Sequence, residues 1–486
     1  MLNEIYSDGV YKNYINGEWK SSNTGNVIDI FSPIDGSKVG SVPAMSKEEI
    51  DEVMFAAKAA QKEWAQVPLI ERAKILNKAA LLLLDFQKEI ADILVVEIAK
   101  DITSSLSEVK RTSDFILFTA DAVKQMRGEM LPADAFPGYG KDRVSFVNRY
   151  PLGTVLAISP FNYPVNLSVS KIAPAIAAGN TVVLKPPTQG AISALYLTKI
   201  FDMAGLPKGV LNTITGKGSE IGDYAVTHED IDFVNFTGST EIGKHISKIT
   251  VMKPLLMELG GKDAAIVLED ADLKEAAKDI VNGAFSYSGQ RCTAVKRVLV
   301  KQEVADELVG YIKARVEKLK TGDPRKDSTV IVPLISEKSA GYVCELIEDA
   351  KEKGAKALTS YKREKNLVYP MLMDYVTEDM RLAWEEPFGP VLPIMRVDSV
   401  EKAIEIANKS EYGLQSAVFT KNIDMAFHIA DKLEVGTVQI NNKTERGPDH
   451  FPFLGVKSSG MGIQGIRYSI EAMTRVKAMV INYEKK

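Results

Sequence analysis

The sequence predicts an α/β protein with two parallel-sheet domains and a small projecting β-sheet. From about residue 150, short β-branched runs alternate with helical segments, a pattern typical of a parallel sheet covered by helices. A second series of this kind runs from KDAAIVLEDADL, which begins at residue 262, to TVQINN, which ends at residue 442. Two stretches that alternate like strands, 142–150 and 474–483, fit neither series. We expect them to pair as the small sheet, which could serve subunit contact.

The elements of the first series follow one another along the chain. Residues 46–130 have helical spacing of apolar residues, and Ser46 is the expected N-cap of the first helix. The runs TVLAISP, NTVVLKPP, GVLNTITG and DFVNFTG come next, each followed by Pro, Gly or Thr and then by a helical segment. Such folds bind ligands at the carboxyl ends of their strands, so chemically distinctive residues are expected there.

The composition excludes several classes of protein. A chain of 486 residues is long enough for two or three domains, and 45% apolar and 26% charged residues are ordinary for a globular protein. A net charge of −4 offers no basic face for nucleic acid. Two cysteines suit a reducing compartment. We see no signal peptide and no apolar run of membrane-spanning length, so the expected location is cytoplasmic, without membrane contact.

Polar residues follow several of the expected strands. Asn162 and Tyr163 come after the first run, and Lys185 and Thr188 come at the end of the second. GSTEIG, residues 238–243, lies at a strand-to-helix turn, where backbone N–H groups could receive a phosphate. Each feature has an ordinary structural explanation, such as a turn asparagine or a solvated lysine, so none decides function alone.

Two further residues are candidates for chemistry. Glu258 stands before a Gly pair, and Cys292 follows it 34 residues later (292 − 258), in a loop of small and polar residues. A lone cysteine is more often a buried small apolar residue, and a carboxylate is more often a helix cap or a surface group. Taken singly, these residues also have ordinary explanations.

Together the motifs resemble the aldehyde dehydrogenase superfamily in identity, order and spacing. The resemblance covers nearly the whole chain and includes FNYP, LKPPT, FTGSTEIG, LMELGGKDAAIV, GQRCTA, EEPFGPV and NNKTERGPDHFPFLGVKSSGMGIQG. It implies a Rossmann-like cofactor-binding domain (1–140 and 151–260), a second α/β domain that is catalytic (261–445), and oligomerisation or bridging segments (141–150 and 446–486). It also implies a homo-oligomer, expected as a dimer of dimers, and no metal site.

The resemblance gives three residues catalytic roles. Cys292, as thiolate, would attack an aldehyde carbon, while the Asn162 amide and the Cys292 backbone N–H bind the oxyanion. Loss of hydride leaves a thioester, and Glu258 matches the general base that activates water for its hydrolysis to a free acid. Because a free thiol titrates at about 8.5, we expect the site to lower the pKa of Cys292, through Arg291, the cofactor's charge or backbone donors.

The expected cofactor is NADP. By resemblance, Lys185 meets the adenosine ribose or its 2′-phosphate. Many NAD-preferring relatives carry a glutamate three residues later, which would repel that phosphate, and here the position is Thr188. Glu386 and Phe388 match residues that hold the nicotinamide ribose and ring. The expected cofactor-binding set is Ser159, Pro160, Lys185, Thr188, Gly218, Gly238, Ser239, Gly243, Leu259, Gly260, Glu386 and Phe388.

Three arginines indicate an anionic substrate. Arg291 precedes the nucleophile, Arg446 lies in the late loop that lines the family's substrate tunnel, and Arg111 lies on a helix that could face it. With Tyr163 and Thr293, this set resembles the branch of non-phosphorylating glyceraldehyde-3-phosphate dehydrogenases. That resemblance implies oxidation of D-glyceraldehyde 3-phosphate to 3-phosphoglycerate. Arginine suits the phosphate because its planar fork pairs with two oxygens.

Several alternatives remain open at this point. The simplest alternative for Arg111, which follows Lys110, is that it is a solvated helix residue. Succinate semialdehyde dehydrogenases also use arginines here, which leaves an acidic semialdehyde as the second substrate class. A Cys–His hydrolase is disfavoured because the four histidines lie in no motif that would orient a base. A catalytically retired relative is disfavoured because both nucleophile and base persist.

Overall fold

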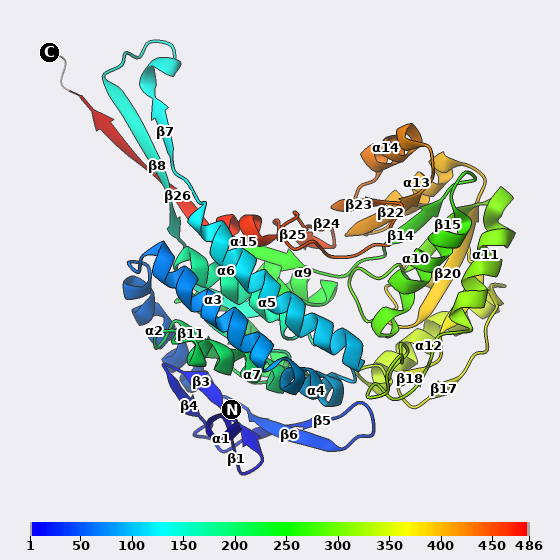
Figure 1. Ribbon diagram of the computed structural model, residues 1–486, viewed down its shortest axis with the longest axis horizontal. Coiled ribbons are helices and arrows are strands. Elements are labelled where there is room, and N and C mark those ends of the chain that lie inside the picture. Colours follow the sequence, from blue (N-terminus) through cyan, green and yellow to red (C-terminus); the bar gives the residue numbers. More distant parts are fainter. Residues whose placement is uncertain (1, 484–486) are drawn as a thin grey trace.

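The computed structural model describes residues 2–483 and contains two large sheets (Figure 1). The first has six strands in the order β11-β10-β9-β12-β13-β25, with β25 antiparallel to β13 and the others parallel. The second has seven strands in the order β16-β19-β20-β15-β14-β22-β23, with β16 antiparallel to β19 and the others parallel. The α/β fold predicted from the sequence is confirmed.

The strands of the two large sheets alternate with helices along the chain. In the first sheet they are β9 (Thr154–Ile158), β10 (Thr181–Lys185), β11 (Leu211–Thr213), β12 (Phe233–Thr237), β13 (Leu255–Glu258) and β25 (Gly460–Met461). In the second they are β14 (Ala264–Val267), β15 (Arg297–Lys301), β16 (Lys356–Ala357), β19 (Met371–Asp374), β20 (Val391–Val397), β22 (Gln415–Phe419) and β23 (Thr437–Ile440).

The α-helices are α1 (Leu2–Ile5), α2 (Lys47–Trp64), α3 (Leu69–Asp85), α4 (Gln87–Ile98), α5 (Ile102–Lys124), α6 (Asn166–Ala178), α7 (Ala191–Met203), α8 (Gly218–Thr227), α9 (Thr240–Ile249), α10 (Leu273–Phe285), α11 (Gln302–Val316), α12 (Glu337–Glu352), α13 (Val400–Asn408), α14 (Ile423–Lys432) and α15 (Ile466–Ala472). Short 3₁₀ turns are η1 (Ala133–Ala135), η2 (Ser286–Gly289) and η3 (Arg381–Ala383). The smaller sheets comprise β1 (Tyr6–Ser7), β2 (Val10–Tyr11), β3 (Asn13–Ile15), β4 (Glu18–Lys20), β5 (Val27–Phe31), β6 (Lys38–Pro43), β7 (Glu129–Pro132), β8 (Arg143–Pro151), β17 (Arg363–Glu364), β18 (Leu367–Val368), β21 (Tyr412–Gly413), β24 (Val456–Lys457) and β26 (Thr474–Asn482).

The helices α2 to α5 occupy the region where the sequence predicts helical spacing. The Ser46 hydroxyl accepts from the backbone N–H of Glu49, and the Glu49 carboxylate accepts from the backbone N–H of Ser46 at 2.8 Å. This reciprocal capping box satisfies two N–H groups that the helix itself cannot pair. The predicted N-cap of the first long helix is therefore confirmed.

The central strands of the first sheet bring their carboxyl ends to one edge. Every residue of β10 and β12 is buried, as expected for parallel strands covered by helices on both faces. Lys185 pairs in register with Ile158 of β9, and Thr237 of β12 pairs with Glu258 of β13. The polar residues that end these strands therefore lie along the same edge of the sheet.

A three-stranded sheet projects from the body of the molecule (Figure 1). Its central strand β8 pairs antiparallel with β26 over its full length and with β7 on the other side. The pairing of 142–150 with 474–483 predicted from the sequence is confirmed. Several large apolar side chains of this arm are exposed, among them Met130, Val476 and Met479.

Within residues 2–483, no helix combines the length and the apolar character needed to cross a bilayer.

Candidate active site

Two cavities meet at Cys292. The larger has a volume of about 980 Å³ and lies along the carboxyl edge of the first sheet. The smaller has a volume of about 200 Å³. Cys292 and Leu167 line both of them. The candidate nucleophile therefore stands where the contents of one cavity can meet the contents of the other.

The loop that carries Cys292 is rigidly fixed after α10. Tyr287 and Ser288 have φ of 52° and 55°, and Gly289 has φ of 72°. A Cβ on Gly289 would lie 2.5 Å from the carbonyl oxygen of Gly389, so only glycine fits this close approach. The Tyr287 hydroxyl donates to the carbonyl of Ile98 at 3.0 Å, and both residues are buried. Three consecutive left-handed residues thus turn the chain and present Cys292 to the cavities.

Two N–H donors belong to residues that line the larger cavity, Asn162 and Cys292 itself. The Asn162 side-chain amide donates one bond to the Gln290 carbonyl at 2.9 Å, which fixes its orientation and leaves its second hydrogen available. The backbone N–H of Cys292 has no hydrogen-bond partner among residues 2–483. Both donors are therefore available to an oxyanion formed on a carbon attached to the sulfur.

A buried ion pair supports the loop of Asn162. Lys100 pairs with Glu108 at 2.5 Å and donates to the Asn162 carbonyl at 3.0 Å. The same ammonium lies 3.2 Å from the centre of the Tyr163 ring. Glu108 also accepts from the backbone N–H groups at the start of α6. This pair could not be found from the sequence, because neither residue lies in the motifs that carry the resemblance.

Glu258 ends β13 and is buried beside Cys292. Its Oε2 accepts from the Thr237 hydroxyl at 3.3 Å and from the Arg446 guanidinium at 3.4 Å, while its Oε1 has no hydrogen-bond partner in the described chain. The Thr237 hydroxyl also accepts from Lys171 at 2.7 Å. Burial lowers the pKa of Lys171 to about 7. Lys171 lies on the wholly buried helix α6, in none of the motifs that predicted the site, and could not be found from the sequence.

The electrostatic environment of the nucleophile differs from the expectation. Burial, and then the negative charge of Glu258, raise the pKa of the Cys292 thiol well above its usual range. Lys296 and Arg446 oppose this shift. The protein's own groups therefore raise the pKa of Cys292, and the prediction that they lower it is wrong. Arg291 is not the source of the opposing charge, because its guanidinium is directed to Ser286, Thr293 and Thr444.

All five expected substrate residues line the smaller cavity: Arg111, Tyr163, Arg291, Thr293 and Arg446. Arg111 donates to both carboxylate oxygens of Asp449, at 2.7 and 2.8 Å, and to the carbonyl of Arg446. It is therefore no freely solvated helix residue. Asp449 was missed at the sequence level, because its distance of 338 residues from Arg111 hides the pairing. The cavity also has Lys443 and Glu445 in its wall.

The larger cavity contains eleven of the twelve expected cofactor residues: Ser159, Pro160, Lys185, Thr188, Gly218, Gly238, Ser239, Leu259, Gly260, Glu386 and Phe388. Gly243 is the exception. It lies one turn into α9, where a Cβ would meet the Leu259 side chain at 2.4 Å, so it permits close packing of the helix against that residue.

The residues of the larger cavity fit a dinucleotide with a 2′-phosphate. Lys185 is buried, its ammonium has no hydrogen bond or ion pair within residues 2–483, and burial lowers its pKa to about 8. An unpaired buried cation is costly unless an anion accompanies it. Thr188 lies near it in the cavity wall and brings no competing negative charge. The N-termini of α8 and α9 supply backbone donors at Gly218 and Ser239.

Among the described residues, no group of three or more His, Cys, Asp or Glu side chains could hold a metal ion.

A parallel-sheet cavity of dinucleotide size that ends at a thiol, with an amide and a carboxylate beside it, defines a class of dehydrogenases that act through a cysteine adduct. Residues 19–479 match the sequence model described as the aldehyde dehydrogenase family, and the chain belongs to that family.

Its relatives are similar over almost their full length. The chain is 58% identical over 475 residues to the NADP-dependent glyceraldehyde-3-phosphate dehydrogenase of Streptococcus equinus, covering 98% of this chain and 99% of the relative. It is 52% identical over 484 residues to the enzyme of that name from Pisum sativum, covering 99% and 97%. The crystal structure of NADP-dependent glyceraldehyde-3-phosphate dehydrogenase from Bacillus halodurans C-125, complexed with NADP, superposes with a TM-score of 0.96 at 52% identity, covering 97% and 99%.

Proposed function

We propose that this protein is an NADP-dependent, non-phosphorylating glyceraldehyde-3-phosphate dehydrogenase that oxidises D-glyceraldehyde 3-phosphate to 3-phosphoglycerate. The observation that carries the proposal is that one sulfur borders both cavities, the larger suited to NADP and the smaller lined by three arginines. The names of the most similar relatives agree with it.

The first half of the reaction is formation of a covalent adduct. Glu258 is buried beside Cys292 and its Oε1 has no hydrogen-bond partner in the described chain, so that carboxylate can take the thiol proton when sulfur attacks the aldehyde carbon. The oxyanion of the thiohemiacetal then receives bonds from the Asn162 amide and the Cys292 backbone N–H. Bound NADP supplies the hydride acceptor for oxidation of the adduct to a thioester.

The second half of the reaction is hydrolysis. Once Glu258 has released the thiol proton to solvent, it is again a carboxylate, and its Oε1, which has no hydrogen-bond partner in the described chain, can accept a proton from water. That water attacks the thioester carbon, the carbon–sulfur bond breaks, and the free carboxylic acid leaves. No inorganic phosphate is consumed and no acyl phosphate forms.

The substrate phosphate is assigned to the smaller cavity. Arg291 has only uncharged acceptors, in Ser286, Thr293 and Thr444, so its positive charge is available to an anion. Arg111 and Arg446 supply further positive charge, which Asp449 and Glu258 partly offset. Arginine keeps its charge throughout the relevant pH range and can bind two phosphate oxygens at once.

Steady-state rates with three aldehydes test this assignment. We expect kcat/KM for glyceraldehyde 3-phosphate to exceed that for unphosphorylated glyceraldehyde by about 100-fold or more, because charge-assisted hydrogen bonds to the phosphate are lost. Succinate semialdehyde is the second comparison, since arginines also bind carboxylates. Equal efficiency with glyceraldehyde would remove the phosphate from the proposal, and a preference for succinate semialdehyde would replace the substrate.

The proposal extends to assembly and location. We infer a homo-oligomer, a dimer of dimers, held in part by the arm of β7, β8 and β26, whose exposed apolar side chains would be covered by another subunit. We infer a cytoplasmic location, because Cys292 and Cys344 are both free thiols and a reducing compartment suits them. Light scattering tests the first inference, and cell fractionation tests the second.

A further inference from the structure

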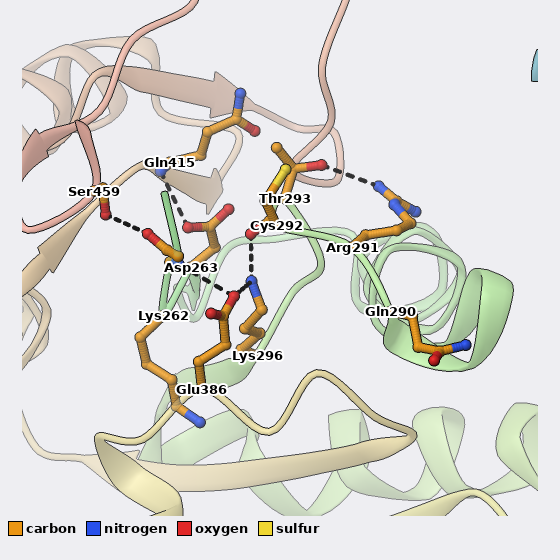
Figure 2. Close-up of polar contacts among 12 residues, drawn as sticks. Lys262, Asp263, Gln290, Arg291, Cys292, Thr293, Lys296, Glu386, Gln415 and Ser459 are labelled. Carbon is orange, nitrogen blue, oxygen red and sulfur yellow. Dashed lines mark hydrogen bonds and ion pairs between the residues drawn. The ribbon is translucent and has the colours of Figure 1, made fainter. Parts of the chain in front are cut away.

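Lys296 connects the nucleophile loop to the wall of the larger cavity (Figure 2). It immediately precedes β15, and its side chain is 2% exposed. The ammonium donates to the backbone carbonyl of Cys292 and forms an ion pair with Glu386 Oε1 at 2.9 Å. One buried side chain thus contacts both the main chain of the nucleophile and a residue expected to hold the cofactor.

Both contacts of Lys296 lie at sensitive positions. The carbonyl of Cys292 belongs to the residue whose N–H would bind the oxyanion and whose sulfur would attack the substrate. Glu386 also accepts from the backbone N–H of Gly261 at 3.2 Å, in the glycine pair that follows Glu258. A shift of either partner would therefore be passed through Lys296 to the other.

The neighbouring buried cations have different partners. Lys262 donates to the Glu385 carbonyl at 2.8 Å, and Arg297 donates to the carbonyls of Ala383 and Ala407. Of these three side chains, Lys296 is the one that turns toward Cys292, as Figure 2 shows for the two lysines. Breaking one member of a buried ion pair leaves an uncompensated charge, so the Lys296–Glu386 contact restrains both residues.

We propose that Lys296 is a positioning residue that fixes the main chain of Cys292 against Glu386, so that the nucleophile and the nicotinamide end of the cofactor cavity keep one relative position. The inference rests on the proposed function for the identity of the cofactor and substrate. The position assigned to Lys296, between Cys292 and Glu386, rests only on the contacts of its side chain. The positive charge of Lys296 also favours the thiolate form of Cys292. It therefore opposes the rise in the thiol pKa that burial and Glu258 cause.

The first test needs no cofactor and no turnover. In Lys296→Met, we expect the midpoint of the pH profile for iodoacetamide alkylation of Cys292 to move upward, with about tenfold slower alkylation at a fixed pH below that midpoint. Cys344, the second of the two cysteines, is an internal reference in the same digest. The other charged or titratable groups that face the thiol or line its cavities are Arg111, Lys171, Lys185, Asp223, Glu241, His245, Glu258, Arg291, Glu386, Lys443, Glu445 and Arg446.

Matched variants separate positioning from general disturbance. Lys262→Met removes a buried lysine from the same cluster that touches neither Cys292 nor the Glu386 side chain, and we expect its alkylation profile to be unchanged. Lys296→Arg keeps the charge and should restore most of the wild-type profile. Equal effects of Lys262→Met and Lys296→Met, or a wild-type profile in Lys296→Met, would overturn the proposal.

The second test uses NADP binding and kinetics. For Lys296→Met we expect NADP to bind about tenfold more weakly, because Glu386 loses its orienting partner. We expect kcat to fall about tenfold, while KM for glyceraldehyde 3-phosphate changes by less than about twofold, because the arginine cavity is untouched. An increase in KM with unchanged kcat would contradict the assigned role.

A double variant keeps the proposal testable if Lys296→Met folds poorly. Lys296→Met with Glu386→Gln removes both charges of the pair and avoids the uncompensated carboxylate. Its loss in NADP affinity should equal that of Glu386→Gln alone, because both act through one contact. Fully additive losses would show that Lys296 does not act through Glu386.

Failure of the proposed function can be told apart from failure of this inference. If no aldehyde is oxidised at all, the proposed function fails, whereas the alkylation profiles still test Lys296.

Discussion

The thiol pKa of Cys292 is raised, and its backbone N–H has no hydrogen-bond partner among the described residues. The carboxylate of Glu258 helps to raise that pKa, and it is also the group that we propose receives the thiol proton. A resting thiol is therefore protected from alkylation and oxidation, while transfer of its proton to Glu258 remains possible during attack on an aldehyde. In the proposed reaction, the same carboxylate releases that proton to solvent and then activates water for hydrolysis, so its loss should separate the two halves of the reaction.

Replacement of Glu258 by Gln should stop turnover after the first half-reaction. The amide cannot take a proton from water, so we expect hydrolysis to slow by about 100-fold or more and the thioester to accumulate. A stoichiometric burst of NADPH followed by very slow steady-state production is the expected stopped-flow trace. Mass spectrometry of the quenched protein should find the acyl group on Cys292. Undiminished steady-state turnover would exclude Glu258 as the base.

The three arginines should differ in their contributions. Arg111 is paired with Asp449, whereas Arg291 has only uncharged acceptors. We therefore expect Arg291→Met to reduce kcat/KM for glyceraldehyde 3-phosphate by about 100-fold and Arg111→Met by about tenfold. Both variants should change kcat/KM for unphosphorylated glyceraldehyde by less than about threefold. Equal losses with the two aldehydes would mean that these arginines serve the fold rather than the phosphate.

The preference for NADP should depend on pH through Lys185. Its pKa is lowered to about 8 by burial, so the ammonium is charged below that pH and becomes neutral as pH rises through it. The affinity for NADP should therefore fall above pH 8, while the affinity for NAD, which lacks the 2′-phosphate, should change little. Calorimetric titrations between pH 6.5 and 9.5 measure both. In Lys185→Met the ratio of the two affinities should be low and independent of pH.

At the scale of helices and strands, much of the fold could be predicted because local pattern and global structure agree. The parallel strands are apolar runs in the sequence, because helices cover both faces of the sheet. Their polar residues come where each strand ends. Eleven of the twelve expected cofactor residues line one cavity for this reason. Gly243 does not, because α9 turns it toward Leu259.

The contacts that could not be predicted depend on the register between distant elements. Asp449 meets Arg111 across 338 residues, and Lys296 meets Glu386 only because two loops that lead into strands of the second sheet lie close together. The pKa of Cys292 was mispredicted for a related reason. Desolvation of the thiol and the approach of Glu258 depend on tertiary packing, which the neighbours of Cys292 in the sequence do not reveal.

The turn before the nucleophile gives a test at this scale. Gly289→Ala adds a Cβ at φ 72°, 2.5 Å from the carbonyl oxygen of Gly389, and we expect a loss of about 3 kcal/mol in stability together with a large loss of activity. Gly205→Ala is the matched control, because φ is 88° there and no atom lies within 4 Å of the added Cβ. It should cost about 1 kcal/mol and leave kcat unchanged. Similar melting temperatures for the two variants would show that the nucleophile loop can relax.

At the scale of the whole molecule, the fold separates the tasks of the proposed reaction. The first sheet supplies Asn162, Lys185 and Glu258 from its strand ends and loops, whereas loops that lead into strands of the second sheet supply Cys292 and Glu386. The nucleophile and the base thus come from different sheets. The arm lies apart from both sheets in Figure 1 and carries none of the residues that line the two cavities, which leaves it available for subunit contact.

The arm gives a test of assembly. On β26, which forms an edge of its three-stranded sheet, Val476 and Val480 are 63% and 54% exposed. Exposed apolar side chains on an unpaired edge favour pairing with another chain, and lysine on such an edge opposes it. We expect Val476→Lys with Val480→Lys to shift the mass measured by light scattering to smaller species, with unchanged circular dichroism. Phe55→Lys, at a 71% exposed position on α2, should leave the mass unchanged. A wild-type protein that is monomeric, or a double variant that keeps the wild-type mass, would mean that the apolar side chains of the arm do not hold the subunits together.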